Sequence, residues 1–384
     1  MPSRRISSRT GNPWFLVSYE TEILNLITRS TYRCFFVKRS TKALIFAVMA
    51  IVVASSAGML LAGGYLNGSS GVKIVDMSGR VVQLNSTANR VVILESYWTE
   101  IACALGAQDK IVGIGSYVTS SVFIPDSVKN KTVVGNVFSG VNIETVLSLK
   151  PDLVIMDYGY GKSEEIVRAL EGAGVPVVTL FAKNFADIAN ATVIIGQALG
   201  KQDRAQALAG YINGIHSQLM ANASRIPVAE RPRVLICNLD VWKDGLIYTY
   251  SNTSWGNVVV DVGGINVAHA GFGDKSWVKV NMEQVLLWDP DIIVIVGRTQ
   301  SALASQISSM NDTNWLSLRA VREGKVYPVL TGSYDRNSYL DWTPRMVAGE
   351  LQLASIIQPA HFASVNWTSV RDQLMDGYYG YLKS

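Results

Sequence analysis

The sequence predicts an α/β protein in which two lobes, each built on a sheet of parallel-type strands, are joined by one long helix. Three observations predict this fold. Helix and strand patterns alternate through residues 72–200 and again through 231–384, a proline-free helical stretch separates them at 201–226, and both halves repeat one sequence unit. Such alternation is typical of parallel βα units. A transmembrane or signal helix is predicted before the first lobe.

Composition describes a folded chain that is almost neutral outside its N-terminal part. The 384 residues are 48% apolar and 17% charged, which excludes a disordered chain and provides core for two or three compact units. Residues 1–66 hold eight of the 34 basic residues and two of the 30 acidic ones, so the remainder has a small acidic excess. Nucleic acid is therefore not indicated as a partner, because nucleic-acid-binding surfaces are strongly basic.

Residues 37–66 are predicted to be a signal or a membrane anchor. Residues 43–66 carry no charge and exceed the roughly 20 apolar residues that cross a bilayer. The positive flank from Lys38 to Lys42 is expected to stay cytoplasmic, which places the rest of the protein outside, at the cell surface or in a periplasm. Cleavage would give a secreted protein and retention an anchored one.

The N-terminal 66 residues are unusual in two ways. Leu61-Ala62-Gly63-Gly64 resembles a bacterial lipobox, but Gly64 replaces the cysteine that lipidation needs. Residues 1–36 show no convincing periodicity, and our hypothesis is that translation begins at Val37 from a non-AUG codon.

Asparagine sequons predict a glycosylated exterior. Eight Asn-X-Ser/Thr sequences occur, more than composition alone predicts, although a compositional accident is the alternative. They begin at Asn67, Asn85, Asn130, Asn190, Asn222, Asn252, Asn311 and Asn366.

The first lobe opens on a predicted β-hairpin at 72–84, turning at Ser78-Gly79. A buried strand at 91–94 leads into a helix over 99–107, for which Thr99 is the expected cap and Gly106 the expected stop. The pattern continues as strand 111–115, helix 143–149, strand 152–156, helix 164–174 and strand 175–180.

The second lobe continues the alternation after Pro227 and Pro232 end the helical stretch at 202–224. Its segments are 233–239, 257–264, 281–288, 291–297 and 325–330. Cys103 and Cys237 lie in apolar stretches of a predicted helix and strand and are expected to be buried. With Cys34 they form no close pair, so a zinc ribbon, a thioredoxin-type motif and a disulfide scaffold are unsupported.

One sequence unit occurs in both halves. Phe138 precedes Glu144 by six residues and Trp277 precedes Glu283 by six, and each glutamate starts a helix–Pro-Asp–strand unit. Two similar open sheets that face one another form a cleft, and such sheets bind ligands at the carboxyl ends of their strands. By this rule the candidate ligand-binding residues are Tyr97, Trp98, Tyr117, Phe138, Tyr158, Trp242, Trp277, Arg298, Arg336 and Trp342.

At this point residues 72–360 resemble the substrate-binding proteins of iron-chelate, haem and cobalamin ABC importers, the Fe/B12 periplasmic-binding family. The resemblance is carried, in order, by DMSGRVV (76–82), VVILESYWTEIACALGAQDKIVGIG (91–115), NIETVLSLKPDLVI (142–155), VDVGGINV (260–267), WVKVNMEQVLLWDPDIIVIVG (277–297) and LRAVREGKVYPV (318–329). It implies a class III solute-binding protein with small opening motions.

The resemblance also implies partners and a cargo. Glu144 and Glu283 are expected to dock onto arginines of an ABC permease dimer, which works with a cytoplasmic ATPase. The positions of Tyr117, Phe138 and Trp277 match aromatic positions of the family. The implied cargo is a ferric siderophore, haem or a corrinoid; a molybdate or tungstate oxyanion, and a surface receptor without permease, are the alternatives. Helix capping is a second explanation for the glutamates, since Asn142 and Asn281 look like N-caps and both roles can hold together.

Catalysis, an intrinsic cofactor and a metal site are not predicted. Gly161-Lys162-Ser163 resembles the end of a P-loop, but the first glycine of that motif is replaced by Met156. The three histidines, His216, His269 and His361, do not cluster in the sequence.

Overall fold

The protein is described here from a computed structural model, which covers residues 71–239, 246–251, 255–269, 272, 275 and 277–383. The predicted N-terminal extension at 1–36, the predicted signal or anchor at 37–66, Cys34 and Trp242 lie outside the described residues. Among the residues that are described, no helix has the length and apolar character needed to span a bilayer.

The opening hairpin forms as predicted. Strands β1 (Val72–Val75) and β2 (Val81–Leu84) pair antiparallel, with Val72 opposite Leu84. Gly79 adopts a φ of 83° in the turn, a conformation that favours glycine. Asp76 accepts hydrogen bonds from the turn and from the Thr179 hydroxyl at 2.7 Å, which fastens the hairpin to the first sheet.

The first sheet has five parallel strands in the order β5-β4-β3-β8-β9. Their bounds are β3 Val91–Ile93, β4 Ile111–Ile114, β5 Thr132–Val133, β8 Leu153–Asp157 and β9 Val177–Leu180. The chain leaves β3 toward β4 and leaves the adjacent β8 toward β9, so the connections diverge between these two neighbours. Such a switch point opens a crevice at the carboxyl ends of the strands.

Helices and one small hairpin surround this sheet. Their bounds are α3 Ser96–Ala104, α4 Asp126–Lys129, α5 Ile143–Ser148, α6 Ser163–Gly172, α7 Phe185–Ala198, β6 Gly135–Asn136 and β7 Gly140–Val141, with short 3-10 turns η2 Gln108–Lys110 and η3 Ser116–Ser120. The predicted start of α3 was wrong: the helix begins at Ser96, and Thr99 donates its hydroxyl hydrogen bond back to the Glu95 carbonyl at 2.8 Å. Gly106, with a φ of 73°, follows the helix end as expected.

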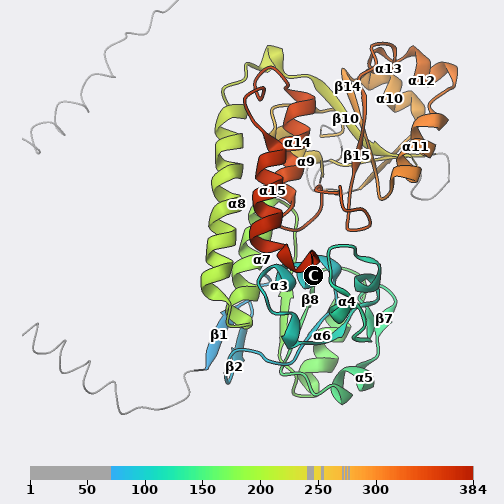
Figure 1. Ribbon diagram of the computed structural model, residues 1–384. Coiled ribbons are helices and arrows are strands. Elements are labelled where there is room, and N and C mark those ends of the chain that lie inside the picture. The colour runs from blue at the N-terminus through green and yellow to red at the C-terminus, as the bar shows by residue number, and fades with distance from the viewer. Residues whose placement is uncertain are drawn as a thin grey trace, which may run out of the picture. The chain divides into compact units, whose positions relative to one another are not determined.

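A long helix, α8 (Gln202–Ala223), leads from the first sheet to the second. It packs along α7 and contacts α9 (Trp255–Asp261) and α14 (Met346–Ile357), as Figure 1 shows for α7 and α14. Its buried side chains face these helices, and Tyr211 and His216 are half-buried on the same helix.

The second sheet is mixed, where the sequence predicted a parallel type. Its order is β13-β11-β10-β14-β15, and β12 also pairs with β10. Strand β11 pairs antiparallel with both β10 and β13, and the other pairings are parallel. The bounds are β10 Arg233–Asn238, β11 Ile247–Thr249, β12 Ile265–Asn266, β13 Val278–Val280, β14 Ile292–Gly297 and β15 Val326–Leu330. The remaining helices and turns are η4 Val228–Glu230, α10 Met282–Trp288, α11 Gln300–Ser309, α12 Thr313–Ser317, α13 Arg319–Arg322, α15 Trp367–Tyr378 and η5 Gly380–Leu382.

The C-terminal part of the chain returns to the first sheet. The Val122 N–H donates to the Ser333 carbonyl at 2.8 Å, and the Tyr381 hydroxyl donates to the Phe123 carbonyl at 2.9 Å. Cys103 and Cys237 are free and buried, as predicted.

Candidate ligand-binding and docking sites

A buried polar cluster lies at the switch point of the first sheet. Asp157 is the last residue of β8, and Glu95 follows the end of β3 by two residues. Glu95 Oε2 accepts the Asp157 N–H at 3.1 Å. Asp157 Oδ1 accepts the Trp98 indole N–H at 2.7 Å, and its Oδ2 accepts the Tyr97 hydroxyl. Strand ends therefore bring together two carboxylates and two aromatic donors.

Burial shapes the charge of this cluster. Removal from water raises the pKa of Asp157 to about 7, although hydrogen bonds from Tyr97 and Trp98 lower it. Burial and the nearby Asp157 also raise the pKa of Glu95 well above its usual range. Glu95 Oε1 is buried without a hydrogen-bond partner among the described residues. The cluster can therefore accept further hydrogen bonds from a donor.

The predicted aromatics of the first lobe differ in exposure. Tyr117 is 49% exposed and Phe138 60% exposed, and Tyr158 is half-buried just beyond β8. Tyr97 is half-buried and lies edge-on to Trp98, with ring centroids 4.6 Å apart. Trp98 is fully buried, which corrects its prediction as a ligand contact: it packs in the core and holds Asp157.

In the second lobe the structure assembles an aromatic cluster that was only half predicted. Trp277 is 52% exposed and lies edge-on to Tyr250 at 5.2 Å between centroids. Trp342 stacks on Trp255 at 4.8 Å, and Tyr250 contacts Trp255 at 6.4 Å. The sequence did not predict Tyr250 and Trp255 as candidates. Candidate residues were expected just after predicted strands, and β11, the strand that precedes Tyr250, was not predicted.

The predicted arginines are exposed and lie over aromatic rings. Arg298 directly follows β14, with its guanidinium 5.1 Å from the centre of the Tyr334 ring. Arg336 lies 5.8 Å from the centre of the Phe123 ring. Both guanidiniums keep donors available, since an aromatic face leaves the edge of the group free.

The two predicted docking glutamates occupy matching places. Glu144 and Glu283 are exposed in the first turns of α5 and α10. The N-caps are as predicted: Asn142 accepts the Thr145 N–H at 2.9 Å, and Asn281 accepts the Gln284 N–H at 3.0 Å. A buried valine anchors each helix, and an exposed leucine lies one turn beyond each glutamate, Leu147 in α5 and Leu287 in α10.

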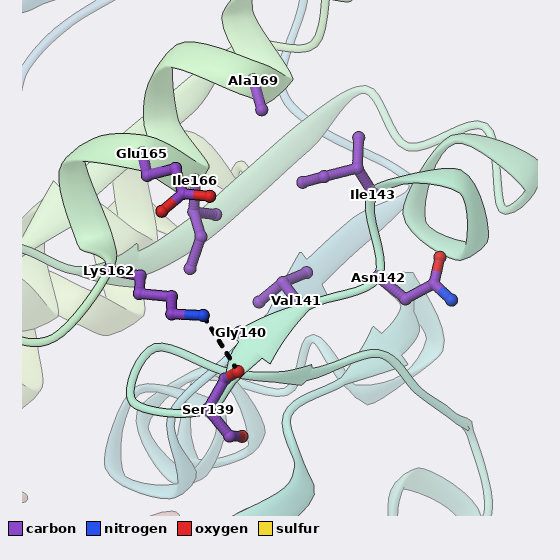
Figure 2. A pocket seen from close by; sticks show the side chains of 9 residues that line it. All are labelled: Ser139, Gly140, Val141, Asn142, Ile143, Lys162, Glu165, Ile166 and Ala169. Carbon is purple, nitrogen blue, oxygen red and sulfur yellow. Dashed lines mark hydrogen bonds between the residues drawn. The ribbon is translucent and has the colours of Figure 1, made fainter.

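A pocket lies beside the first of these helices. It encloses about 340 Å³ between the β6–β7 hairpin, the start of α5 and the first turns of α6 (Figure 2). The Lys162 ammonium reaches the Ser139 carbonyl at 3.5 Å across it. Its lining residues are Ser139, Gly140, Val141, Asn142, Ile143, Lys162, Glu165, Ile166 and Ala169.

Comparison with known proteins adds three findings. Residues 91–329 match the sequence profile described as periplasmic binding protein. An ABC transporter substrate-binding lipoprotein of Bacillus subtilis, YvrC, is 30% identical over 76% of this chain and 87% of its own length. A cobalamin-binding protein of Halobacterium salinarum is 26% identical over 73% of this chain and 72% of its own length.

One solved structure shows the same fold. The molybdate-bound MolA of Haemophilus influenzae superposes with a TM-score of 0.67 at 24% identity, covering 80% of this chain and 97% of the other.

Proposed function

The chain belongs to the periplasmic binding protein family and is the substrate-binding component of an ABC transporter, and from this premise we propose that it captures a metal chelate and delivers it to a permease. The family is one of solute transport and not an enzyme class. We further propose that the chelate is a corrinoid, with a ferric siderophore or haem as the other candidates.

The observation that carries this proposal is the carboxyl pair Glu95 and Asp157 at the switch point. Carboxyl oxygens accept hydrogen bonds, and a carboxyl that ionises repels anions. A corrinoid carries peripheral amide groups that donate hydrogen bonds, whereas haem propionates and catecholates are anionic. The exposed rings of Tyr117, Phe138 and Trp277 supply the apolar contact that a large flat ligand needs. The cobalamin-binding relative from Halobacterium salinarum supports the same cargo.

An oxyanion is the second candidate cargo. Arg298 and Arg336 keep exposed donors that suit molybdate or tungstate. An anion placed beside Glu95 and Asp157 would, however, meet two carboxyls, and Glu95 Oε1 has no hydrogen-bond donor among the described residues. We therefore rank the oxyanion below the chelate.

We propose that Glu144 and Glu283 contact the two permease subunits. One exposed carboxylate on each lobe gives two charge-assisted contacts that fix orientation. The exposed Leu147 and Leu287 add apolar area beside them. The pocket lined by Asn142 and Ile143 lies beside the start of α5 and offers room for a permease side chain.

We propose that residues 43–66 tether the protein to a membrane and that its outer surface is glycosylated. The sequon asparagines among the described residues, Asn85, Asn130, Asn190, Asn222, Asn311 and Asn366, are all exposed. Peptide mass spectrometry of the native protein tests both points: unmodified sequons would refute glycosylation, and a mature N-terminus after residue 66 would refute a retained anchor.

The test of the cargo is a calorimetric titration of the full-length protein in detergent. Cyanocobalamin, haem, a ferric catecholate siderophore, molybdate and tungstate are compared. Saturable binding of cyanocobalamin at micromolar or lower concentration, weakened about tenfold in Glu95→Gln, is expected. Binding of haem or the siderophore instead would keep a chelate but overturn the corrinoid, and binding of an oxyanion alone would overturn the chelate.

A further inference from the structure

Three helices bring together a histidine and two carboxylates that are far apart in the sequence. His216 lies on α8, Asp261 ends α9, and Glu350 lies on α14. One potential ligand atom from each residue lies within 4.8 Å of the others. His216 Nδ1 is 2.8 Å from Glu350 Oε2. The cluster lies where α8, the helix between the two sheets, contacts α9 and α14.

Glu350 is the least satisfied member of this cluster. Its side chain is fully buried, and Oε1 has no hydrogen-bond partner among the described residues. Neither Glu350 nor Asp261 has a lysine or arginine partner in the described part of the chain. A buried and a half-buried carboxylate that share one imidazole are costly, and metal coordination is one of the ways in which proteins offset that cost.

The three groups shift one another's pKa values. Burial raises the pKa of Glu350 to about 7 and that of Asp261 to about 6, although His216 lowers both. Glu350 and Asp261 raise the pKa of His216 against the effect of its burial. Two carboxylates therefore share a single imidazole as their positive group.

We propose that His216, Asp261 and Glu350 bind a divalent first-row cation, of which Zn²⁺ is the probe. Imidazole nitrogen and carboxylate oxygen are ordinary ligands of Zn²⁺, and three protein ligands leave a position for water. His216 is partly exposed, which gives the cation a route to the buried Glu350. Phe185 stacks on the imidazole at 4.1 Å between centroids and 7° between planes, which fixes the orientation of the ring.

This site is separate from the cargo site. It shares no residue with the proposed cargo site, so the proposal holds whatever the cargo is. A bound cation would tie α8 to α9 and α14 and would stiffen the junction at which the linking helix meets the second half of the chain.

The test is calorimetric titration of Zn²⁺ into untagged, chelator-treated, full-length protein in detergent. One saturable site is expected in the wild type, and at least tenfold weaker binding in His216→Gln and Asp261→Asn. His361→Gln is the matched control, because His361 makes a surface pair with Glu230 at 3.2 Å and should leave binding unchanged. No saturable binding, or equal binding in His216→Gln, would overturn the site.

A second measurement separates a metal site from a purely structural contact. Glu350→Gln keeps the size of the side chain and an oxygen that can bond to His216, but it removes the negative charge that a cation needs. Zn²⁺ should raise the unfolding temperature of the wild type and leave Glu350→Gln unchanged. An equal shift in both proteins would contradict the proposal. Co²⁺ adds a direct readout, since a visible absorption band at one equivalent that is absent in Asp261→Asn reports the ligands themselves.

Discussion

Arg345 and Glu100 form a two-point ion pair across 245 residues, and neither side chain is exposed to solvent. Arg345 Nε and Nη2 lie 2.7 and 3.0 Å from the two Glu100 oxygens. Tyr379 also donates to Glu100 at 2.8 Å, and Asp341 contacts Arg345 at 3.2 Å. This network fastens the start of α14 and the C-terminal residues to α3. Arg345 therefore has a structural role.

Removing one partner of this pair should destabilise the protein strongly. Arg345→Met leaves Glu100 buried without its cation, and we expect a loss of about 3–5 kcal/mol in the free energy of unfolding. Urea unfolding measures it. Lys383→Ala, which breaks the exposed pair with Asp376, should change little. Arg345→Met combined with Glu100→Leu should recover part of the loss, and a double variant no more stable than Arg345→Met would contradict the assignment.

The Glu95–Asp157 cluster should make stability depend on pH. The folded pKa of Asp157 is about 7 and the unfolded value is about 4, so the folded state binds more protons between them. Its contribution to the free energy of unfolding is therefore present below pH 4 and is lost as the pH rises toward 7. Asp157→Asn should lose less stability than the wild type between pH 5 and pH 8. Urea unfolding at pH 5 and pH 8 measures both proteins. If the wild type and Asp157→Asn lost the same free energy of unfolding between these pH values, the raised pKa of Asp157 would be refuted.

The proposed docking glutamates, Glu144 and Glu283, should affect transport and leave cargo binding intact. Glu144→Ala and Glu283→Ala each remove a charge from one lobe, and uptake into proteoliposomes holding the permease and its ATPase should fall at least tenfold. Glu164→Ala is the control, since Glu164 also lies exposed in a first helical turn, that of α6. Uptake that falls equally in Glu164→Ala would point to a general charge effect.

The exposed tryptophan of the second lobe should contribute to cargo affinity. Trp277→Ala removes the most exposed ring of its cluster, and we expect about tenfold weaker binding, which is about 1.4 kcal/mol. Calorimetry with the cargo that binds the wild type measures it. Leu316→Ala, at a residue as exposed as Trp277 but on α12, should bind normally. Unchanged affinity in Trp277→Ala would remove this residue from the site.

The two buried cysteines should be inert. Burial raises the pKa of the Cys103 and Cys237 thiols, so little thiolate is present at neutral pH. In a Cys34→Ser background, a disulfide-exchange reagent should modify neither thiol until denaturant is added. Rapid labelling of the native protein would contradict the burial.

Several features of this protein could be predicted from its sequence alone. The alternation of helix and strand, the hairpin turn at Gly79, the helix between the two sheets and the caps Asn142 and Asn281 follow from periodicity and local hydrogen bonding. These are properties of residues within a few positions of one another, and a chain segment carries them by itself.

The tertiary structure decided what depends on residues distant in sequence. The helix α3 starts at Ser96 because Glu95 is extended and its carboxylate turns to the Asp157 N–H instead of capping the helix. The antiparallel β11 depends on pairing with β10 and β13. His216, Asp261 and Glu350 meet only because three helices pack together. Pairing and packing are set by the competition of all segments for one core, and no local pattern encodes the outcome.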